Sequence, residues 1–132
     1  TAFVGILDVI TGNMEYACAG HDAPIVRRNG RLLHIDTANI SGPPLCAAGD
    51  YPYLAATVQL QAGDLLCLYT DGVTEAHRGT ELFGGKRLEQ TLLANGEQRY
   101  DEAYAALKAA TAWRPTSSLA TAASSCSFRR KS

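Results

Sequence analysis

Short apolar segments separated by tight turns place the strongest limit on how this chain can fold. Residues 1–19 contain two strand-like segments on either side of the turn sequence Thr11-Gly12-Asn13. The dipeptide Asn29-Gly30 then divides residues 24–35 into two further strands, and it is among the strongest short-range signals for a hairpin. Because tight turns of this kind join antiparallel neighbours, two hairpins so close together predict an antiparallel sheet.

The middle of the chain continues this pattern after an irregular stretch. Residues 36–53 carry Gly-Pro-Pro and Gly-Asp, which interrupt regular structure. The turn sequence 61–64 then separates two apolar segments, so the order strand, tight turn, strand is predicted once more. Strands are expected at residues 1–9, 14–19, 24–28, 31–35, 54–60 and 65–70.

Helical spacing replaces strand-like alternation in the last third of the chain. Residues 86–94 place Leu88 and Leu92 on one helical face. Residues 100–113 are rich in alanine, follow helical spacing and are closed by Pro115, which cannot continue a helix. Several antiparallel strands followed by two helices predict an α+β fold.

Length and charge limit the class of protein. The 132 residues suffice for one domain with a modest core. The formal net charge is -1, from 12 Lys and Arg against 13 Asp and Glu, so no general field attracts nucleic acid or anionic lipid. No segment reaches the ~18 apolar residues of a membrane span, and no signal-peptide pattern opens the chain. We therefore predict no nucleic-acid partner, no membrane insertion and a cytoplasmic location.

The four cysteines are widely spaced and form neither a CxxC pair nor a zinc-like pattern with histidine. Cys18 and Cys67 lie inside strand-like segments. This placement predicts buried free thiols in a protein of a reducing compartment.

The two ends of the chain differ from an ordinary domain. Residues Thr1-Ala2-Phe3 begin a strand without a polar lead, which is typical of a piece cut from a longer protein. After Pro115, residues 116–132 are small, polar and aperiodic, and this composition predicts disorder or loose packing rather than a core element. We accordingly expect a domain over residues 1–115 and an atypical tail over 116–132.

The apolar segment 65–70 ends at Asp71-Gly72, and Glu75 follows closely. A carboxylate placed where a buried strand emerges suits a hard divalent cation such as Mg²⁺, and a glycine lets the backbone approach closely. A strand-ending Asp-Gly turn is the commoner explanation of such a pair, and Glu75 serves equally well as a cap. Because Mg²⁺ or Mn²⁺ needs several oxygen ligands, Asp71 alone does not make a site.

His21-Asp22 is a second candidate, since an imidazole beside a carboxylate at a strand end suits a general base with its orienting partner. The commoner role of such a histidine is to hydrogen-bond loop backbone and to pack strands together. Ser41 and His34 complete the residue types of a Ser-His-Asp triad. No G-x-S-x-G elbow accompanies them, so a hydrolase of that kind is not predicted.

Four segments in consistent order resemble a known family. They read FVGILDVITGNMEYACAGHDAPIV, SGPPL, LQAGDLLCLYTDGVTEA and LFGGKRLEQTL, and GDLLCLYTDGVTEA is the most specific part. Together they resemble the C-terminal two-thirds of the bacterial SpoIIE/RsbU-like phosphatases, from residue 1 to about residue 115. These belong to the metal-dependent type 2C (PPM-type) class of Ser/Thr protein phosphatases.

The resemblance implies an αββα sandwich, incomplete here, and a site for two Mn²⁺ or Mg²⁺ ions that activate water for attack on phosphoserine or phosphothreonine. The implied substrate and partner is a phosphorylated anti-anti-sigma factor of the STAS type. The resemblance makes Asp71 a metal ligand of the Thr-Asp-Gly motif, with Gly72 keeping the turn open for the ion. His21, Gly42 and Pro43 match positions that shape loops and sheet packing.

The sequence also departs from the family pattern. The Gly-Gly-Asp and Asp-Val-x-Gly-x-Gly segments that supply further metal-binding aspartates do not occur, and Ser117-Ser118 stand where the family has a paired Asp-Asp. Truncation at the start and a frameshift near residue 115 are the hypotheses that explain these differences. We expect phosphatase activity of the parent domain, with a catalytically inactive binding module for a partner-switching regulator as the alternative. Since unpaired strand edges favour self-association, a homodimer is a further hypothesis.

Overall fold

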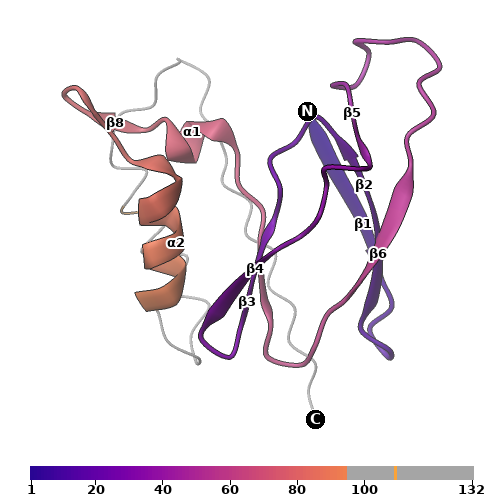
Figure 1. Cartoon of the computed structure of the whole chain (residues 1–132), viewed down its shortest axis with the longest axis horizontal. Coiled ribbons are helices and arrows are strands. Elements are labelled where there is room, and N and C mark those ends of the chain that lie inside the picture. The colour runs from indigo at the N-terminus through magenta and orange to yellow at the C-terminus, as the bar shows by residue number, and fades with distance from the viewer. Residues whose placement is uncertain (95–108, 110–132) are drawn as a thin grey trace.

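The computed structural model describes residues 1–94 and Ala109, and it arranges the strands in two main sheets with a helix packed on one of them (Figure 1). The elements in chain order are β1 (Ala2–Leu7), β2 (Asn13–Ala19), β3 (Ile25–Arg28), β4 (Arg31–His34), β5 (Ser41–Gly42), β6 (Ala55–Gln59), β7 (Leu65–Cys67), α1 (Asp71–Thr74), β8 (His77–Arg78), β9 (Glu81–Leu82) and α2 (Gly84–Ala94). The fold is α+β, as the order of the sequence segments predicts.

The first sheet is built around β2. β1 pairs with β2 in antiparallel register along its whole length, while β6 and the short β5 share the other side of β2. Asp8 organises the turn between β1 and β2, because its carboxylate accepts hydrogen bonds from the Ile10 amide and the Thr11 hydroxyl, both at 2.8 Å. The first predicted hairpin is therefore confirmed.

The second sheet has the strand order β4-β3-β7, with all pairs antiparallel. In the turn between β3 and β4, Asn29 and Gly30 have φ angles of 48° and 71°. Positive φ at both central residues is the geometry of a type I′ turn, whose twist matches that of the paired strands. The hairpin predicted from Asn-Gly is therefore confirmed.

The segments around residues 61–64 do not form a third hairpin. The turn itself forms, with the Asp64 amide donating to the Gln61 carbonyl at 3.1 Å, but β6 pairs with β2 whereas β7 pairs with β3. The Asp64 carboxylate just before β7 forms an ion pair with Arg28 of β3 at 2.6 Å, and the Arg28 guanidinium also donates to the Gln59 carbonyl at the end of β6 at 2.8 Å. The chain therefore crosses from the first sheet to the second at this turn.

Two apolar clusters hold the layers together. One lies between the two sheets and contains Met14, Tyr16 and Val26. The other lies between the second sheet and α2, where Leu88 and Leu92 are 0% and 1% exposed and, four residues apart, share one helical face. Helix, sheet and sheet follow one another in Figure 1, which gives three of the four layers of an αββα sandwich.

Some element bounds differ from the sequence-based expectation. β7 ends at Cys67 rather than at residue 70, because its partner β3 begins at Ile25, directly opposite Cys67. The short strand β5 arises inside the stretch 36–53 that was expected to be irregular, and the hairpin of β8 and β9 was not expected at all.

The last part of the chain is outside the structural description. The expected helix over 100–113, apart from Ala109, and the expected tail over 116–132 lie outside the described residues. Among the helices that are described, none has the length and apolar character required to cross a membrane.

Candidate active site

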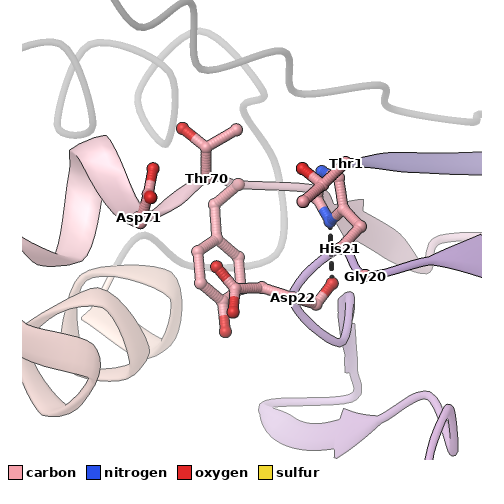
Figure 2. A pocket seen from close by; sticks show the side chains of 7 residues that line it. Thr1, Gly20, His21, Asp22, Thr70 and Asp71 are labelled. Atoms are coloured by element: carbon pink, nitrogen blue, oxygen red, sulfur yellow. Dashed lines mark hydrogen bonds between the residues drawn. The ribbon is translucent and has the colours of Figure 1, made fainter. Parts of the chain in front are cut away.

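Segments that follow β2 and β7 meet at one end of the sandwich around a cavity of about 130 Å³. Figure 2 shows Thr70 and Asp71, which precede and begin α1, on one side of this cavity, and the residues that follow β2 on the other. The cavity is lined by Thr1, Gly20, His21, Asp22, Tyr69, Thr70 and Asp71. The fold thus brings together Asp71 and the pair His21-Asp22, which the sequence had singled out separately.

Asp71 is the first residue of α1. Thr70 before it is extended, with φ -118° and ψ 166°, and the Glu75 amide donates to the Asp71 carbonyl to close a single helical turn. The Asp71 side chain is exposed, and no hydrogen bond or ion pair from residues 1–94 engages its carboxylate. A buried strand therefore ends in a fixed turn that leaves one carboxylate available to a ligand.

The expected Asp-Gly turn is a helical turn instead. Gly72 is the second residue of α1 and is not among the glycines with positive φ, so the backbone here does not require glycine. Glu75 is the C-cap of α1 and is not among the residues that line the cavity. Of the two acidic residues in this motif, only Asp71 lines it.

His21 uses its ring to build the loop after β2. Its Nδ1–H donates to the backbone carbonyl of Asp22 at 2.9 Å (Figure 2). The His21 carbonyl accepts a hydrogen bond from the Cys18 thiol at 3.2 Å. The ring also packs edge-on against Phe3, with centroids 6.4 Å apart. Because the bond runs to the backbone, the Asp22 carboxylate is not the orienting partner of an imidazole base in this arrangement.

The residue types of a Ser-His-Asp triad are dispersed. Ser41 in β5 donates its hydroxyl to the Cys18 sulfur at 3.6 Å. His34 in β4 lies 3.5 Å from the Glu89 carboxylate of α2. Neither Ser41 nor His34 lines the cavity, so no such triad is assembled.

Gly42 and Pro43 do not line the cavity; their roles are in packing at the end of β2, where Gly42 pairs with Ala19. A Cβ on Gly42 would lie 2.4 Å from a ring carbon of Tyr51 and 2.8 Å from one of Tyr53. The Tyr53 hydroxyl donates to the Pro43 carbonyl at 3.0 Å. Only glycine fits between these rings, which explains why this residue type stands there.

Sequence reasoning did not single out Tyr69 and Thr70 as site residues. Burial raises the pKa of Tyr69, and the nearby negative charge of Asp22 adds to the shift, so the phenol stays protonated at neutral pH. The Thr70 hydroxyl is buried and has no hydrogen-bond partner in the described part of the chain. Both residues directly precede Asp71 in the sequence YTDG, and that adjacency is the signal that could have found them.

The cavity supplies only part of a metal site. Asp22 and Asp71 contribute carboxylates, whereas Mg²⁺ takes a near-octahedral set of oxygen ligands. Within residues 1–94, no three His, Cys, Asp or Glu side chains gather closely enough to hold a metal ion. The described residues therefore do not form a complete centre for the ions that the family implies.

Sequence comparison assigns most of the chain to one family. Residues 1–116 match the family described as Stage II sporulation protein E (SpoIIE). Protein IcfG from Synechocystis sp. is 33% identical over 96 residues, which cover 72% of this chain and 15% of that protein.

Solved structures with the same fold include several PP2C phosphatase domains. The RsbU and RsbW domains of Rv1364c from Mycobacterium tuberculosis align with a TM-score of 0.66 at 24% identity, covering 82% of this chain and 31% of that one. A second structure contains the PP2C phosphatase domain of SpoIIE from Bacillus subtilis with a fragment of its regulatory domain. It aligns with a TM-score of 0.64 at 17% identity, and the alignment covers 83% of this chain and 32% of that one. This chain spans well under half the length of each of these proteins. The family match over residues 1–116 establishes that the chain belongs to the SpoIIE family, and the structural matches show that it shares the fold of PP2C phosphatase domains.

Proposed function

We propose that this chain forms the part of a PP2C-type phosphatase domain that presents Asp71 as a metal ligand, with Gly72 beside it. In this proposal the parent domain hydrolyses phosphoserine or phosphothreonine on a regulatory protein. The observation that carries the proposal is the exposed Asp71 carboxylate, which lines a cavity at the end of a buried strand and has no partner within residues 1–94. Bound Mn²⁺ or Mg²⁺ ions would lower the pKa of coordinated water and clamp phosphoryl oxygens.

The charges around the cavity support a role for a cation. Two carboxylates, Asp22 and Asp71, line a small cavity together, and both repel a phosphate dianion. Phosphate enters such a site only when cations neutralise the carboxylates. Tyr69 and Thr70 retain hydroxyl protons that can be donated to a phosphoryl oxygen, and the buried Thr70 hydroxyl lacks any other partner among the described residues.

The proposed substrate is a phosphorylated anti-anti-sigma factor of the STAS type, in a cytoplasmic partner-switching pathway. Membership of the SpoIIE family supports this choice. One protein of the same fold contains an RsbU domain and an RsbW domain in a single polypeptide.

Metal titration and a phosphatase assay test the proposal. Calorimetry with Mn²⁺ should give weak binding to the chain, and binding should be lost in Asp71→Asn but kept in Glu15→Gln, which changes an exposed carboxylate on β2. Hydrolysis of a phosphoserine peptide by the chain alone should be negligible, because the carboxylate set is incomplete. In a polypeptide that is extended at its N-terminus and carries Asp-Asp in place of Ser117-Ser118, turnover should appear and should require Asp71. Turnover or metal binding that survives Asp71→Asn contradicts the proposed role of this residue.

A catalytically inactive binding module is the second candidate function. The lack of three clustered metal-ligating side chains within residues 1–94 favours it. If the extended polypeptide binds a purified STAS-domain protein but gives no turnover with Mn²⁺, this second candidate replaces the first.

A further inference from the structure

Strand β4 forms an open edge of the second sheet, away from the cavity at Asp71. Within the described part of the chain, β4 pairs only with β3. Because β3 starts near Asp22 and runs away from the cavity, the turn between β3 and β4 lies at the opposite end of the sandwich (Figure 1). A hollow of about 410 Å³ opens there, lined by Arg28, Asn29, Arg31 and Leu33.

The pairing register identifies the backbone groups at this edge. The Ile35 amide donates to the Pro24 carbonyl at 2.9 Å, and this bond continues the ladder of β3 and β4. Bonded and non-bonded pairs alternate in an antiparallel ladder, so the amides and carbonyls of Leu32 and His34 point away from β3. Within residues 1–94 these donors and acceptors have no strand partner, and an incoming strand can bind to them.

Two side chains on one face of β4 add chemical selectivity. Arg31 and Leu33 are two residues apart in a strand and therefore share a face. Leu33 is 44% exposed, a large value for a leucine in a sheet. The Arg28 guanidinium is already neutralised by Asp64, at 2.6 Å, whereas exposed Arg31 has no ion-pair partner among the described residues.

We propose that the β4 edge binds an extended acidic segment of a partner protein, which adds to the sheet as a further strand. A carboxylate of that segment pairs with Arg31, and an apolar side chain two residues away packs on Leu33. Charge complementarity selects an acidic segment, and the period of two along a strand sets the spacing of its acidic and apolar residues. This interaction goes beyond the proposed phosphatase activity and involves none of the residues that line the cavity.

Fluorescence anisotropy with a labelled peptide tests this inference. The probe is Thr-Glu-Thr-Leu-Thr-Glu-Thr, whose Glu and Leu side chains share one face of a strand. The full chain should bind it saturably and at least tenfold more tightly than a matched peptide with Lys in place of Glu. Arg31→Glu should reverse this preference, whereas Lys86→Glu, the same charge change on an exposed residue of α2, should leave it unchanged. Methylation of the peptide amides should weaken binding, because it removes the donors of strand pairing.

Each alternative outcome overturns the inference. Equal binding of the two peptides, or an Arg31→Glu variant that keeps the original preference, excludes the proposed charge pairing. Sedimentation equilibrium checks for a second copy of the chain as the occupant: a dimer that Arg31→Glu or Leu33→Asp dissociates, without peptide binding by wild type, assigns the edge to self-association instead. Circular dichroism confirms that each variant is folded. No metal is added to these measurements, so their outcome is independent of the phosphatase assay.

Discussion

Two aspartates flank strand β7, and their surroundings are opposite. Asp64 precedes the strand and is 3% exposed, whereas Asp71 follows it and is exposed. The Asp64 carboxylate accepts hydrogen bonds from the Arg28 guanidinium at 2.6 to 3.1 Å and from the Gln61 amide at 2.8 Å. No hydrogen bond or ion pair within residues 1–94 engages the Asp71 carboxylate.

This contrast separates two uses of the same residue type. A buried carboxylate must be fully paired, because an unpaired buried charge costs several kcal/mol. An exposed carboxylate held on a short helical turn remains free to take a ligand. Asp64 therefore helps to hold β7 in its sheet through its contact with Arg28 of β3. Asp71, which follows the strand, presents its carboxylate to the cavity.

Asp64→Ala tests the structural role of Asp64 just before β7, and it should change the free energy of unfolding more than any other substitution proposed below. It leaves the partly buried Arg28 cation without its partner and removes the acceptor of the Gln61 amide, so the free energy of unfolding should fall by about 3 kcal/mol. Urea denaturation followed by circular dichroism measures this loss. If the unfolding free energy fell by less than about 1 kcal/mol, the crossing between the sheets would be fixed by contacts other than this ion pair.

Cys67, in the strand between the two aspartates, should report how well β7 is sealed from water. Burial raises the pKa of the Cys67 thiol to about 11 from its ordinary value of 9.0. The folded state therefore holds this proton more tightly than the unfolded state does. Its contribution to stability is complete below about pH 9 and is lost as the pH rises towards 11, by about 2 kcal/mol.

The measurement compares the pH dependence of unfolding in wild type and Cys67→Ala. Between pH 9 and pH 11, the unfolding free energy of the wild type should fall more steeply than that of Cys67→Ala. The difference between the two slopes gives the contribution of the Cys67 thiol, because the other titrating groups are common to both proteins. Parallel slopes would show that water reaches the middle of β7.

Gly42→Ala sharpens the comparison, because it tests a residue whose role is packing, in the first sheet, where Gly42 pairs with Ala19 of β2. Its Cβ would collide with the rings of Tyr51 and Tyr53, so we expect a loss of about 1 to 2 kcal/mol in unfolding free energy. Gly85→Ala is the matched control: nothing lies within 4 Å of its Cβ, and it lies in α2 without positive φ. It should stabilise the protein by about 0.5 kcal/mol, since alanine favours helix. If Gly42→Ala and Gly85→Ala changed the unfolding free energy by the same amount in the same direction, the packing role of Gly42 would be contradicted.

Local features of the sequence predicted much of this fold, and long-range contacts account for what they missed. Asn29-Gly30 specifies a hairpin by itself, because two adjacent residues determine the turn geometry. β6 and β7 pair with different sheets, and the contact between Arg28 and Asp64 at this crossing joins residues 36 apart, which turn chemistry does not encode. The single turn of α1 was also missed, since four residues are too few to display helical periodicity.

The same distinction applies to the candidate site. Asp71 and His21 were identified from short motifs, and the fold brings both to one cavity. The exclusion of Glu75 from the cavity, and the bond from the His21 ring to a backbone carbonyl rather than to a carboxylate, depend on local geometry that residue types leave open. Motifs thus locate chemistry along a chain, whereas side-chain direction decides which group can take part in it.

Asp71→Asn should have the smallest effect on stability, and that small effect is informative. The substitution keeps the size and shape of the side chain and removes a charge that no described residue pairs, so the unfolding free energy should change by less than about 0.5 kcal/mol. The same urea titration used for Asp64→Ala measures it under identical conditions. A loss above about 1.5 kcal/mol would make Asp71 a structural residue like Asp64, and its availability as a ligand would have to be abandoned. A negligible change, combined with loss of Mn²⁺ binding, is the pattern expected of a residue retained for chemistry, because selection for stability alone gives no reason to keep an unpaired carboxylate at this position.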